Sequence, residues 1–283
     1  MFRLPATVAI SRFGELVGRG AARVLDFRLG GEAGQGGAPR VLVTCEHAGS
    51  ALPLGYSWNA RDEQRVAQTH WAYDPGAAEF ASELASALQG VAVLSTFSRL
   101  LVDVNRPLAS PTLIRRDCGD HTVELNEFIG VQEIDRRVAE FYVPFHLTLN
   151  AVAAEVQPDL ILSVHSFTQH YDGQAARDFE IGVLCSHDED LAGHFLDTFE
   201  AAGFPSRLNE PYSGKEGIMH SPESLAGPLE GGGRVPAIMF EFRNDRCTAQ
   251  EWRARAIDQI AHVVSSRTRT GAEEEGEGGG DGE

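Results

Sequence analysis

The 283-residue chain has little lysine and a shortage of positive charge. Its 24 basic residues include a single lysine, Lys215, against 41 acidic residues, and the formal net charge is −17. Nucleic-acid-binding proteins contact phosphates through clusters of Lys and Arg, so this balance argues against a nucleic-acid partner. Part of the acidity is local, because residues 271–283 include six acidic residues and no basic one. We predict that the tail, 269–283, is disordered.

Cysteine is also scarce, and long apolar runs are absent. The four cysteines, Cys45, Cys118, Cys185 and Cys247, form no CxxC pair, which disfavours a cysteine-rich zinc site and a disulfide framework. No apolar run approaches the ~20 residues of a membrane span, and the N-terminus is too short and too weakly apolar for a secretory signal. We therefore expect a cytoplasmic protein with no membrane partner. The sequence leaves its oligomeric state open.

The order of the predicted elements is typical of an α/β protein. Apolar runs predict strands at 40–44, 91–97, 159–164, 181–185 and 235–240, and helical patterns lie at 60–69, 77–88, 132–155, 189–202 and 249–265. This alternation predicts a single three-layer domain with helices on both faces of a mixed, mainly parallel sheet. Pro144 predicts a kink or break in the long helix. The run 98–107 is expected to be a further extended piece.

Glycine marks the predicted domain boundary. Residues 30–37 form a Gly-rich connector, so we expect an N-terminal extension at 1–38 and the main domain at 39–268. Short apolar runs at 6–10 and 24–27 predict an edge strand or hairpin within the extension.

Three predicted strands each lead into a His or a Glu. His47 follows the strand 40–44, His165 follows 159–164, and Glu241 follows 235–240. Ligands of open α/β sheets bind outside the carboxyl ends of the strands, so we expect these side chains on one rim. Two imidazoles and one carboxylate are a common ligand set of a catalytic zinc. We therefore predict one Zn²⁺ ion bound by His47 and His165.

The third ligand has to come from elsewhere. Asp74 is the best candidate; it precedes Pro75 and also fits the N-cap of the helix 77–88. His70 and Glu46 are the alternatives. Beside this site, Cys45 is either a reactive thiol or a buried small residue, and its place at the end of a strand favours the second.

Glu241 is a candidate general base. A carboxylate at this rim can take a proton from a water whose pKa a metal has lowered to ~7, and can return that proton to a leaving amine. The alternative is a structural ion pair with Arg243 or Arg246.

Asn105 and Arg106 are candidates for binding a substrate carboxylate. A guanidinium binds a carboxylate in bidentate fashion, and a neighbouring amide adds a directional hydrogen bond. Arg99 can polarise a scissile carbonyl or add a carboxylate contact. Arg115 and Arg116, in a predicted overlying loop, can contact a dicarboxylate. The alternative for each arginine is a surface salt bridge.

The motifs CEHAG, HWAYDPGA, SRLLVDVNRP, PFH, SVHSFT, GVL, NEPYSG and FEFRND, in this order over residues 40–247, resemble the N-formylglutamate amidohydrolase family. More distantly, the chain is similar to zinc carboxypeptidases and aspartoacylases, which implies a phosphorylase/hydrolase-like fold. The carboxypeptidases carry a His-x-x-Glu ligand pair, whereas Ser50 stands three residues after His47 here.

The resemblance implies zinc at His47 and His165, a carboxylate clamp at Asn105-Arg106 and a general base at Glu241. It also implies hydrolysis of N-formyl-L-glutamate to formate and L-glutamate, a step of histidine degradation. Tyr212 of the NEPYSG motif is a candidate substrate contact. The alternatives are a carboxypeptidase or cell-wall amidase on the same fold, and a non-catalytic protein that binds a small carboxylate.

Overall fold

The computed structural model describes residues 16–18, 20–28, 38–171, 173–226 and 233–267. The predicted run 6–10, the Gly-rich connector and the acidic tail lie outside these residues. The described part of the predicted extension forms two strands of the main sheet, and the proposed domain boundaries stay a prediction. None of the described helices is long and apolar enough to cross a membrane.

An eight-stranded sheet with the order β1-β2-β4-β3-β7-β10-β8-β9 organises the fold. Its strands are β1 (Leu16–Gly18), β2 (Ala22–Asp26), β3 (Val41–Cys45), β4 (Val91–Ser95), β7 (Leu160–Phe167), β8 (Ile181–Leu184), β9 (Ser206–Leu208) and β10 (Ala237–Arg243). The four central strands, β4, β3, β7 and β10, are parallel, whereas β2 pairs antiparallel with β4 and β8 pairs antiparallel with β10. The predicted α/β class and mixed sheet are confirmed.

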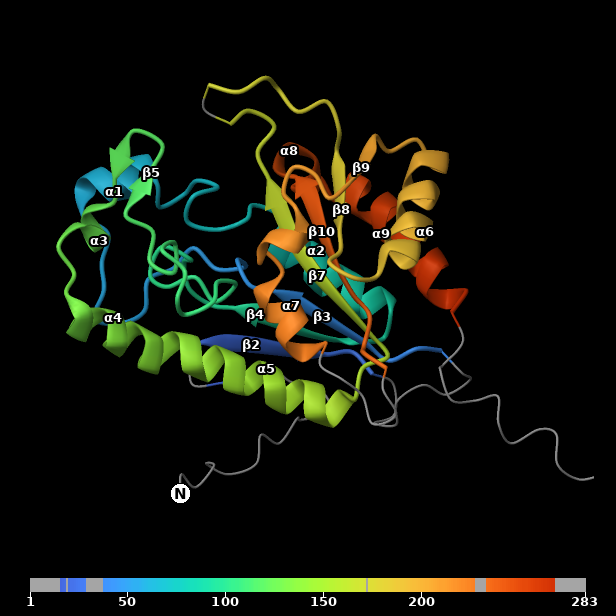
Figure 1. Cartoon of the computed structure of the whole chain (residues 1–283), viewed down its shortest axis with the longest axis horizontal. Helices are drawn as coiled ribbons and strands as arrows, with labels where there is room; N and C mark the ends of the chain where they lie inside the picture. Colours follow the sequence, from blue (N-terminus) through green and yellow to red (C-terminus); the bar gives the residue numbers. More distant parts are fainter. Residues whose placement is uncertain (1–15, 19, 29–37, 172, 227–232, 268–283) are drawn as a thin grey trace, which may run out of the picture.

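Helices cover both faces of this sheet (Figure 1). The helices are α1 (Ala60–Arg65), α2 (Ala77–Ala87), α3 (Glu124–Glu127), α4 (Val131–Arg137), α5 (Val143–Val156), α6 (Glu189–Ala201), α7 (His220–Leu225), α8 (Asn244–Cys247) and α9 (Gln250–Ser265). Two short helical turns, η1 (Val138–Tyr142) and η2 (Gly214–Glu216), and a two-stranded sheet of β5 (Asp117–Cys118) and β6 (His121–Thr122) complete the fold.

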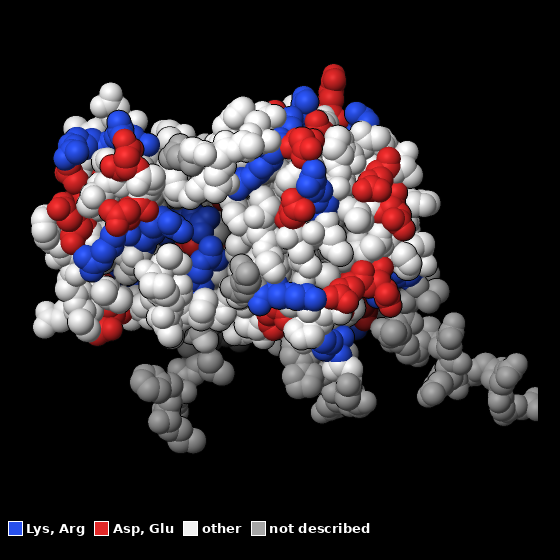
Figure 2. All heavy atoms as spheres, turned by 45° about the horizontal axis from the view of Figure 1, so that its top comes forward, with Lys and Arg blue, Asp and Glu red and all other residues white. Residues whose placement is uncertain are grey.

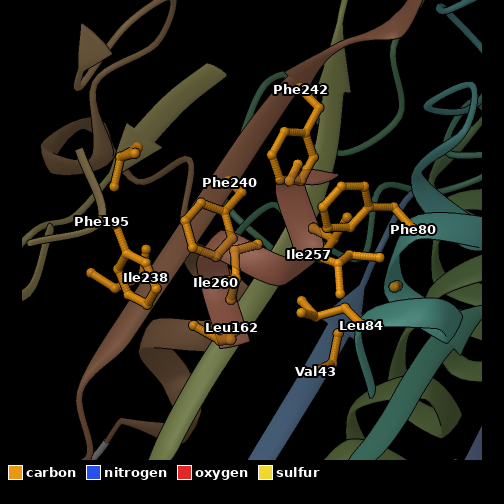
Figure 3. Close-up of a cluster of buried hydrophobic side chains, with 14 of the residues drawn as sticks. Val43, Phe80, Leu84, Leu162, Phe195, Ile238, Phe240, Phe242, Ile257 and Ile260 are labelled. Atoms are coloured by element: carbon orange, nitrogen blue, oxygen red, sulfur yellow. The ribbon is translucent and has the colours of Figure 1, made fainter. Parts of the chain in front are cut away.

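Successive residues of a strand point to opposite faces, and the core follows this alternation. Val41 and Val43 of β3 pack into a cluster with α2, α6 and α9, whereas Leu42 packs on the other face with α5. Figure 3 shows the first cluster, in which Phe240 and Phe242 of β10 meet side chains of α2, α6 and α9. Both faces of the central strands are buried, which explains their nearly continuous apolar sequences.

The predicted long helix contains a π-helical turn where the sequence places a proline. The segment η1, with π-helical geometry, joins α4 to α5 directly before Pro144. Proline has no backbone N–H, so the wider turn accommodates the missing hydrogen bond without ending the helix. The interruption predicted at this residue is therefore observed as a π turn.

Two sequence interpretations were wrong. The run 98–107 is not an extended strand: its backbone forms turns, with Leu101 N–H donating to Ser98 O and Arg106 N–H to Asp103 O. Its buried apolar side chains pack in a loop, which explains why the run resembles a strand. Asp74 is not the N-cap of α2, because Gly76, in the left-handed region at φ 82°, holds that position.

Candidate active site

The carboxyl ends of parallel strands bring the predicted site residues together. His47 lies two residues beyond β3, but His165 and Glu241 lie within β7 and β10 rather than after them. In the β7–β10 register, His165 and Glu241 are direct partners on neighbouring strands. Residues from three different strands therefore meet at one rim of the sheet, as the spacing of the motifs predicts.

Asp74 joins the two histidines from the loop that leads into α2. Its Oδ2 atom lies 2.8 Å from His165 Nδ1 and 3.4 Å from His47 Nδ1, and it accepts a hydrogen bond from Ser166 N–H. The backbone N–H of Asp74 donates to His47 O, which fixes the loop against the end of β3. All three side chains are buried.

Each imidazole has a second carboxylate on its other nitrogen. His47 Nε2 lies 2.8 Å from Asp103 Oδ1, and His165 Nε2 lies 2.9 Å from Glu46 Oε2. A carboxylate on one ring nitrogen keeps the proton there and leaves the other nitrogen free to bind a metal. Nδ1 of both histidines lies near the same Asp74 oxygen, so it is the nitrogen that could share a metal ion with Asp74.

The cluster has the composition and spacing of a metal site. One ligand atom each from His47, Asp74 and His165 lies within 4.8 Å of the other two, and atoms bonded to one zinc ion at ~2.0–2.2 Å have to be about this close. Two imidazoles and a carboxylate leave a position open for water or substrate. These residues fit a divalent metal, and the cluster could hold one.

The alternative ligands have other positions. Glu46 is buried behind His165, where it also accepts a hydrogen bond from Ser163 Oγ, so it orients the histidine. His70 lines the cavity and lies against the Trp71 ring, and it is not part of the metal-binding group found in the described chain. Burial raises the pKa of the Cys45 thiol well above its usual value, which favours the packing interpretation of this residue.

The electrostatics of the cluster are dominated by burial and by close opposite charges. Burial lowers the pKa of His165, but hydrogen bonds to Asp74 and Glu46 outweigh it and raise the pKa to about 10. Burial raises the pKa of Asp103, and Arg99 and His47 more than reverse this, so the carboxyl stays ionised. These two pKa shifts indicate that ionised carboxylates and Arg99 surround the two imidazoles.

Asp103 is a residue of the site that the sequence did not predict. Its Oδ1 contacts His47 Nε2 and accepts from Asn105 N–H, and its Oδ2 accepts from Arg99 Nε and Nη2. One carboxylate thus fixes a histidine, an arginine and the turn that carries Arg106. Its place two residues before the Asn-Arg pair was the available signal.

Glu241 is buried and has an unpartnered oxygen. Its Oε2 atom has no hydrogen-bond partner within the described residues. Burial and the charge of the neighbouring Asp74 raise the pKa of this carboxyl, His165, Arg99 and Arg177 lower it, and the net result is a pKa of about 7. Neither Arg243 nor Arg246 pairs with it: they contact Glu180 and Asp245. A buried carboxyl with a pKa near neutrality has the properties of a general base.

The Asn105-Arg106 turn lies beside the cluster, and hydrogen bonds to neighbouring segments fix its position. Asn105 Nδ2 donates to Ile218 O, just before α7, and its Oδ1 accepts from Ser221 N–H, within α7. Tyr142 of η1 donates to Arg106 O. Among the described residues, the Arg106 guanidinium donates only to Asn105 O, so most of its donors are available to a ligand.

The other predicted arginines have different surroundings. Arg99 lines the cavity but is bound to Asp103, with its Nη1 3.9 Å from Asp74 Oδ1. Arg115 lines the cavity near the Trp71 ring. Arg116 does not line it, because its guanidinium donates to Glu127 O and Ile129 O. The interpretation of Arg116 as a dicarboxylate contact was wrong.

A close backbone approach brings Tyr212 to the cavity wall. Gly182 of β8 is the antiparallel partner of Glu241, and a Cβ at this glycine would lie 2.0 Å from Glu210 O. Only glycine therefore lets the segment that carries Pro211 and Tyr212 lie against β8 next to Glu241. The phenolic pKa of Tyr212 is raised by burial and by Glu241.

These residues surround one cavity of about 290 Å³. Its lining includes His47, Asp74, His165, Glu241 and four arginines, one of which, Arg177, the sequence interpretation missed. Figure 2 shows Lys and Arg side chains running into a recess on the face turned toward the reader. A basic cavity in a chain with a net charge of −17 favours an anionic ligand.

Comparisons with known proteins agree with this architecture. The structure of gene product Atu2144 from Agrobacterium tumefaciens is similar, with 29% identity, a TM-score of 0.73, and coverage of 90% of this chain and 97% of that chain. The N-formylglutamate amidohydrolase of Ralstonia eutropha JMP134 shares the fold, with 16% identity, a TM-score of 0.62, and coverage of 87% and 96%. No curated protein matches in sequence.

A family model supplies the assignment. The model of the N-formylglutamate amidohydrolases matches residues 39–247, which span the sheet from β3 to β10 and include His47, Asp74 and His165. The resemblance inferred from the motifs is therefore confirmed, and the chain belongs to the N-formylglutamate amidohydrolase family.

Proposed function

We propose that this protein is a metal-dependent hydrolase that cleaves the amide bond of an N-acyl amino acid. Its family suggests N-formyl-L-glutamate as the substrate, with formate and L-glutamate as products. The observation that carries the proposal is the position of Glu241: a buried carboxyl with an unpartnered oxygen lies next to His165 of a three-residue metal-binding cluster.

His47, Asp74 and His165 would hold the ion, and Zn²⁺ is the proposed metal because two imidazoles and a carboxylate are a common zinc set. When bound, zinc supplies Lewis-acid chemistry, which polarises a carbonyl and makes a water more acidic. Glu46 and Asp103 would keep both imidazoles in the orientation and tautomer that binding requires.

Glu241 would carry the proton through the reaction. Its carboxylate would accept a proton from the attacking water and donate it to the leaving nitrogen, so that the amine departs neutral. A pKa of about 7 suits both transfers at neutral pH. Arg99, which lines the cavity, would stabilise the negative charge that develops on the carbonyl oxygen.

Arg106 would bind the α-carboxylate of the substrate. Its guanidinium has no carboxylate partner within the described residues, whereas the Asn105 amide is already bonded to Ile218 O and Ser221 N–H. Asn105 would therefore mainly hold the turn and add at most its second amide hydrogen. Tyr212 would close the cavity over the bound substrate.

The test is formate release from N-formyl-L-glutamate by purified protein loaded with one equivalent of Zn²⁺. We expect turnover in the parent chain, and loss of turnover with full metal content in Glu241→Gln. The exposed Glu189→Gln variant is the matched control. Cleavage of short peptides or muramyl peptides instead would favour a carboxypeptidase or cell-wall amidase, and binding without any turnover would favour a carboxylate-binding protein.

A further inference from the structure

Three arginines line the cavity without an acidic partner. Within the described residues, Arg106, Arg115 and Arg177 make no ion pair with Asp or Glu, whereas arginines outside the cavity, such as Arg40 and Arg253, pair at 2.8 and 2.7 Å. The chain has 41 acidic residues, so unpaired arginines gathered in one cavity are not explained by a lack of partners. Their free donors point to anionic groups on the ligand.

Arg177 is distant from the Asn105-Arg106 turn in the sequence and contacts different residues. It belongs to the connection between β7 and β8, where its guanidinium lies 5.3 Å from the Phe167 ring centroid, 5.7 Å from Tyr171 and 5.5 Å from Tyr212. Its Nη1 donates to Thr168 O at 2.8 Å. The aromatic surroundings and this one hydrogen bond hold the guanidinium in place and leave its other donors without a partner in the described chain.

The two positions have different neighbours. Burial and the nearby charges of Arg99 and Arg115 lower the pKa of Arg106, so Arg106 and Arg115 lie within electrostatic reach of each other. Arg177 instead lies among aromatic rings and near Tyr212. The cavity therefore has two basic positions from separate loops. Arg106 and Arg115 precede His165 in the sequence, and Arg177 follows it.

We propose that Arg177 binds a second carboxylate, the one on the substrate side chain, and thereby determines a preference for acidic N-acyl amino acids. The inference rests on the proposed function, because it takes the α-carboxylate to be bound by Arg106. A guanidinium that is already oriented loses little freedom on forming a bidentate pair with a carboxylate, and it discriminates against an uncharged amide of the same size.

The test compares N-formyl-L-glutamate with N-formyl-L-glutamine, which differ in one carboxylate. In the Arg177→Gln variant we expect kcat/KM for the glutamate compound to fall on the order of 30- to 100-fold, with less than about a threefold change for the glutamine compound. Arg177→Lys should retain part of the preference. Arg65→Gln, which removes the same charge at an exposed site paired with Asp120, should change neither value.

An equal loss on both substrates would overturn the proposal, because Arg177 would then act on the reaction or the fold. An unchanged preference would also overturn it. Calorimetric binding of glutarate and its monoamide separates this inference from the proposed function, since it needs no turnover. Tighter binding of glutarate in the parent chain, lost in Arg177→Gln, supports the subsite; equal binding of the two compounds to the parent contradicts it.

Discussion

The strand-end part of the site (His47, His165 and Glu241) and the loop-borne part (Arg106, Arg115 and Arg177) differ in their bonding. Both histidine nitrogens of the first part are already engaged by buried carboxylates. The arginines of the second part have no acidic partner in the described chain and are only half buried. We infer that the rigid part performs the chemistry and the loop-borne part recognises the substrate.

Because of this difference, changes to the two histidines should abolish metal binding and turnover, and a change to Glu241 should abolish turnover alone. Changes in the loop-borne part should instead alter KM and substrate preference. The residues between them, Asp103 above all, should show mixed effects, since Asp103 bonds to His47, to Arg99 and to the Arg106 turn.

The largest effect is expected for His165→Ala. It removes one of three ligands and leaves Glu46 and Asp74 without their imidazole partner. Bound zinc should fall below a tenth of an equivalent, and turnover should fall by at least about 10³-fold, because a two-ligand site binds zinc weakly. Elemental analysis after dialysis measures the first value and formate release the second. The exposed His194→Ala on α6 should retain both, and a fully metallated His165→Ala would contradict the ligand assignment.

Arg106→Gln should lower kcat/KM for N-formyl-L-glutamate by about 10- to 100-fold, the usual cost of one charge-assisted pair. Most of this should be a rise in KM, with zinc content unchanged, because the guanidinium contacts none of the three metal ligands. Steady-state kinetics with parallel metal analysis check this. A loss confined to kcat would show that Arg106 acts in the chemical step, as the strand-end part does, and not in substrate recognition.

Glu46→Gln and Asp103→Asn should each weaken zinc binding by about 10- to 100-fold, the usual effect of removing a carboxylate behind a metal-binding histidine. Competition with a chelator of known affinity measures this without reference to activity. Asp103→Asn should also raise KM, since it loosens the turn that carries Arg106, whereas Glu46→Gln should not. Identical kinetic profiles for the two variants would show that the two parts of the site are not separable.

The smallest effect concerns the pH dependence of stability in zinc-free protein. The Glu241 pKa of about 7 lies above its ordinary value of 4.5, so folding favours the protonated carboxyl. Between about pH 4.5 and pH 7, the Glu241 carboxyl is ionised in the unfolded chain but still protonated in the folded one. The free energy of unfolding should therefore fall as pH rises through this range and then level off. Glu241→Gln removes this penalty and should raise the Tm by a few degrees at pH 8 but not at pH 4. A lower Tm for Glu241→Gln than for the parent chain at pH 8 would contradict the inference that ionised Glu241 destabilises the fold.

Much of the fold followed from the sequence because the central strands are buried on both faces and their apolar runs are nearly uninterrupted. The strand ends were harder: β7 and β10 continue through His165 and Glu241, since polar side chains at a sheet rim do not interrupt backbone pairing. The loop 98–107 was mistaken for a strand because it is apolar and buried without regular hydrogen bonds.

The site was predictable where a motif follows a strand and unpredictable where only folding brings residues together. His47, Asp74 and His165 meet as the spacing suggested, whereas Arg177 depends on tertiary contacts that no local pattern encodes. Arg116 shows the converse: next to Arg115 in sequence, it points its donors at two backbone carbonyls outside the cavity.

We propose that the His47-Asp74-His165 cluster and Glu241 together hydrolyse an N-acyl amino acid. The most direct test is formate release from N-formyl-L-glutamate as Zn²⁺ is titrated into metal-free protein. We expect turnover to rise linearly and to saturate at one equivalent in the parent chain, while Glu241→Gln binds the same equivalent and stays inactive. Activity in the metal-free protein, or full activity in Glu241→Gln, would contradict it.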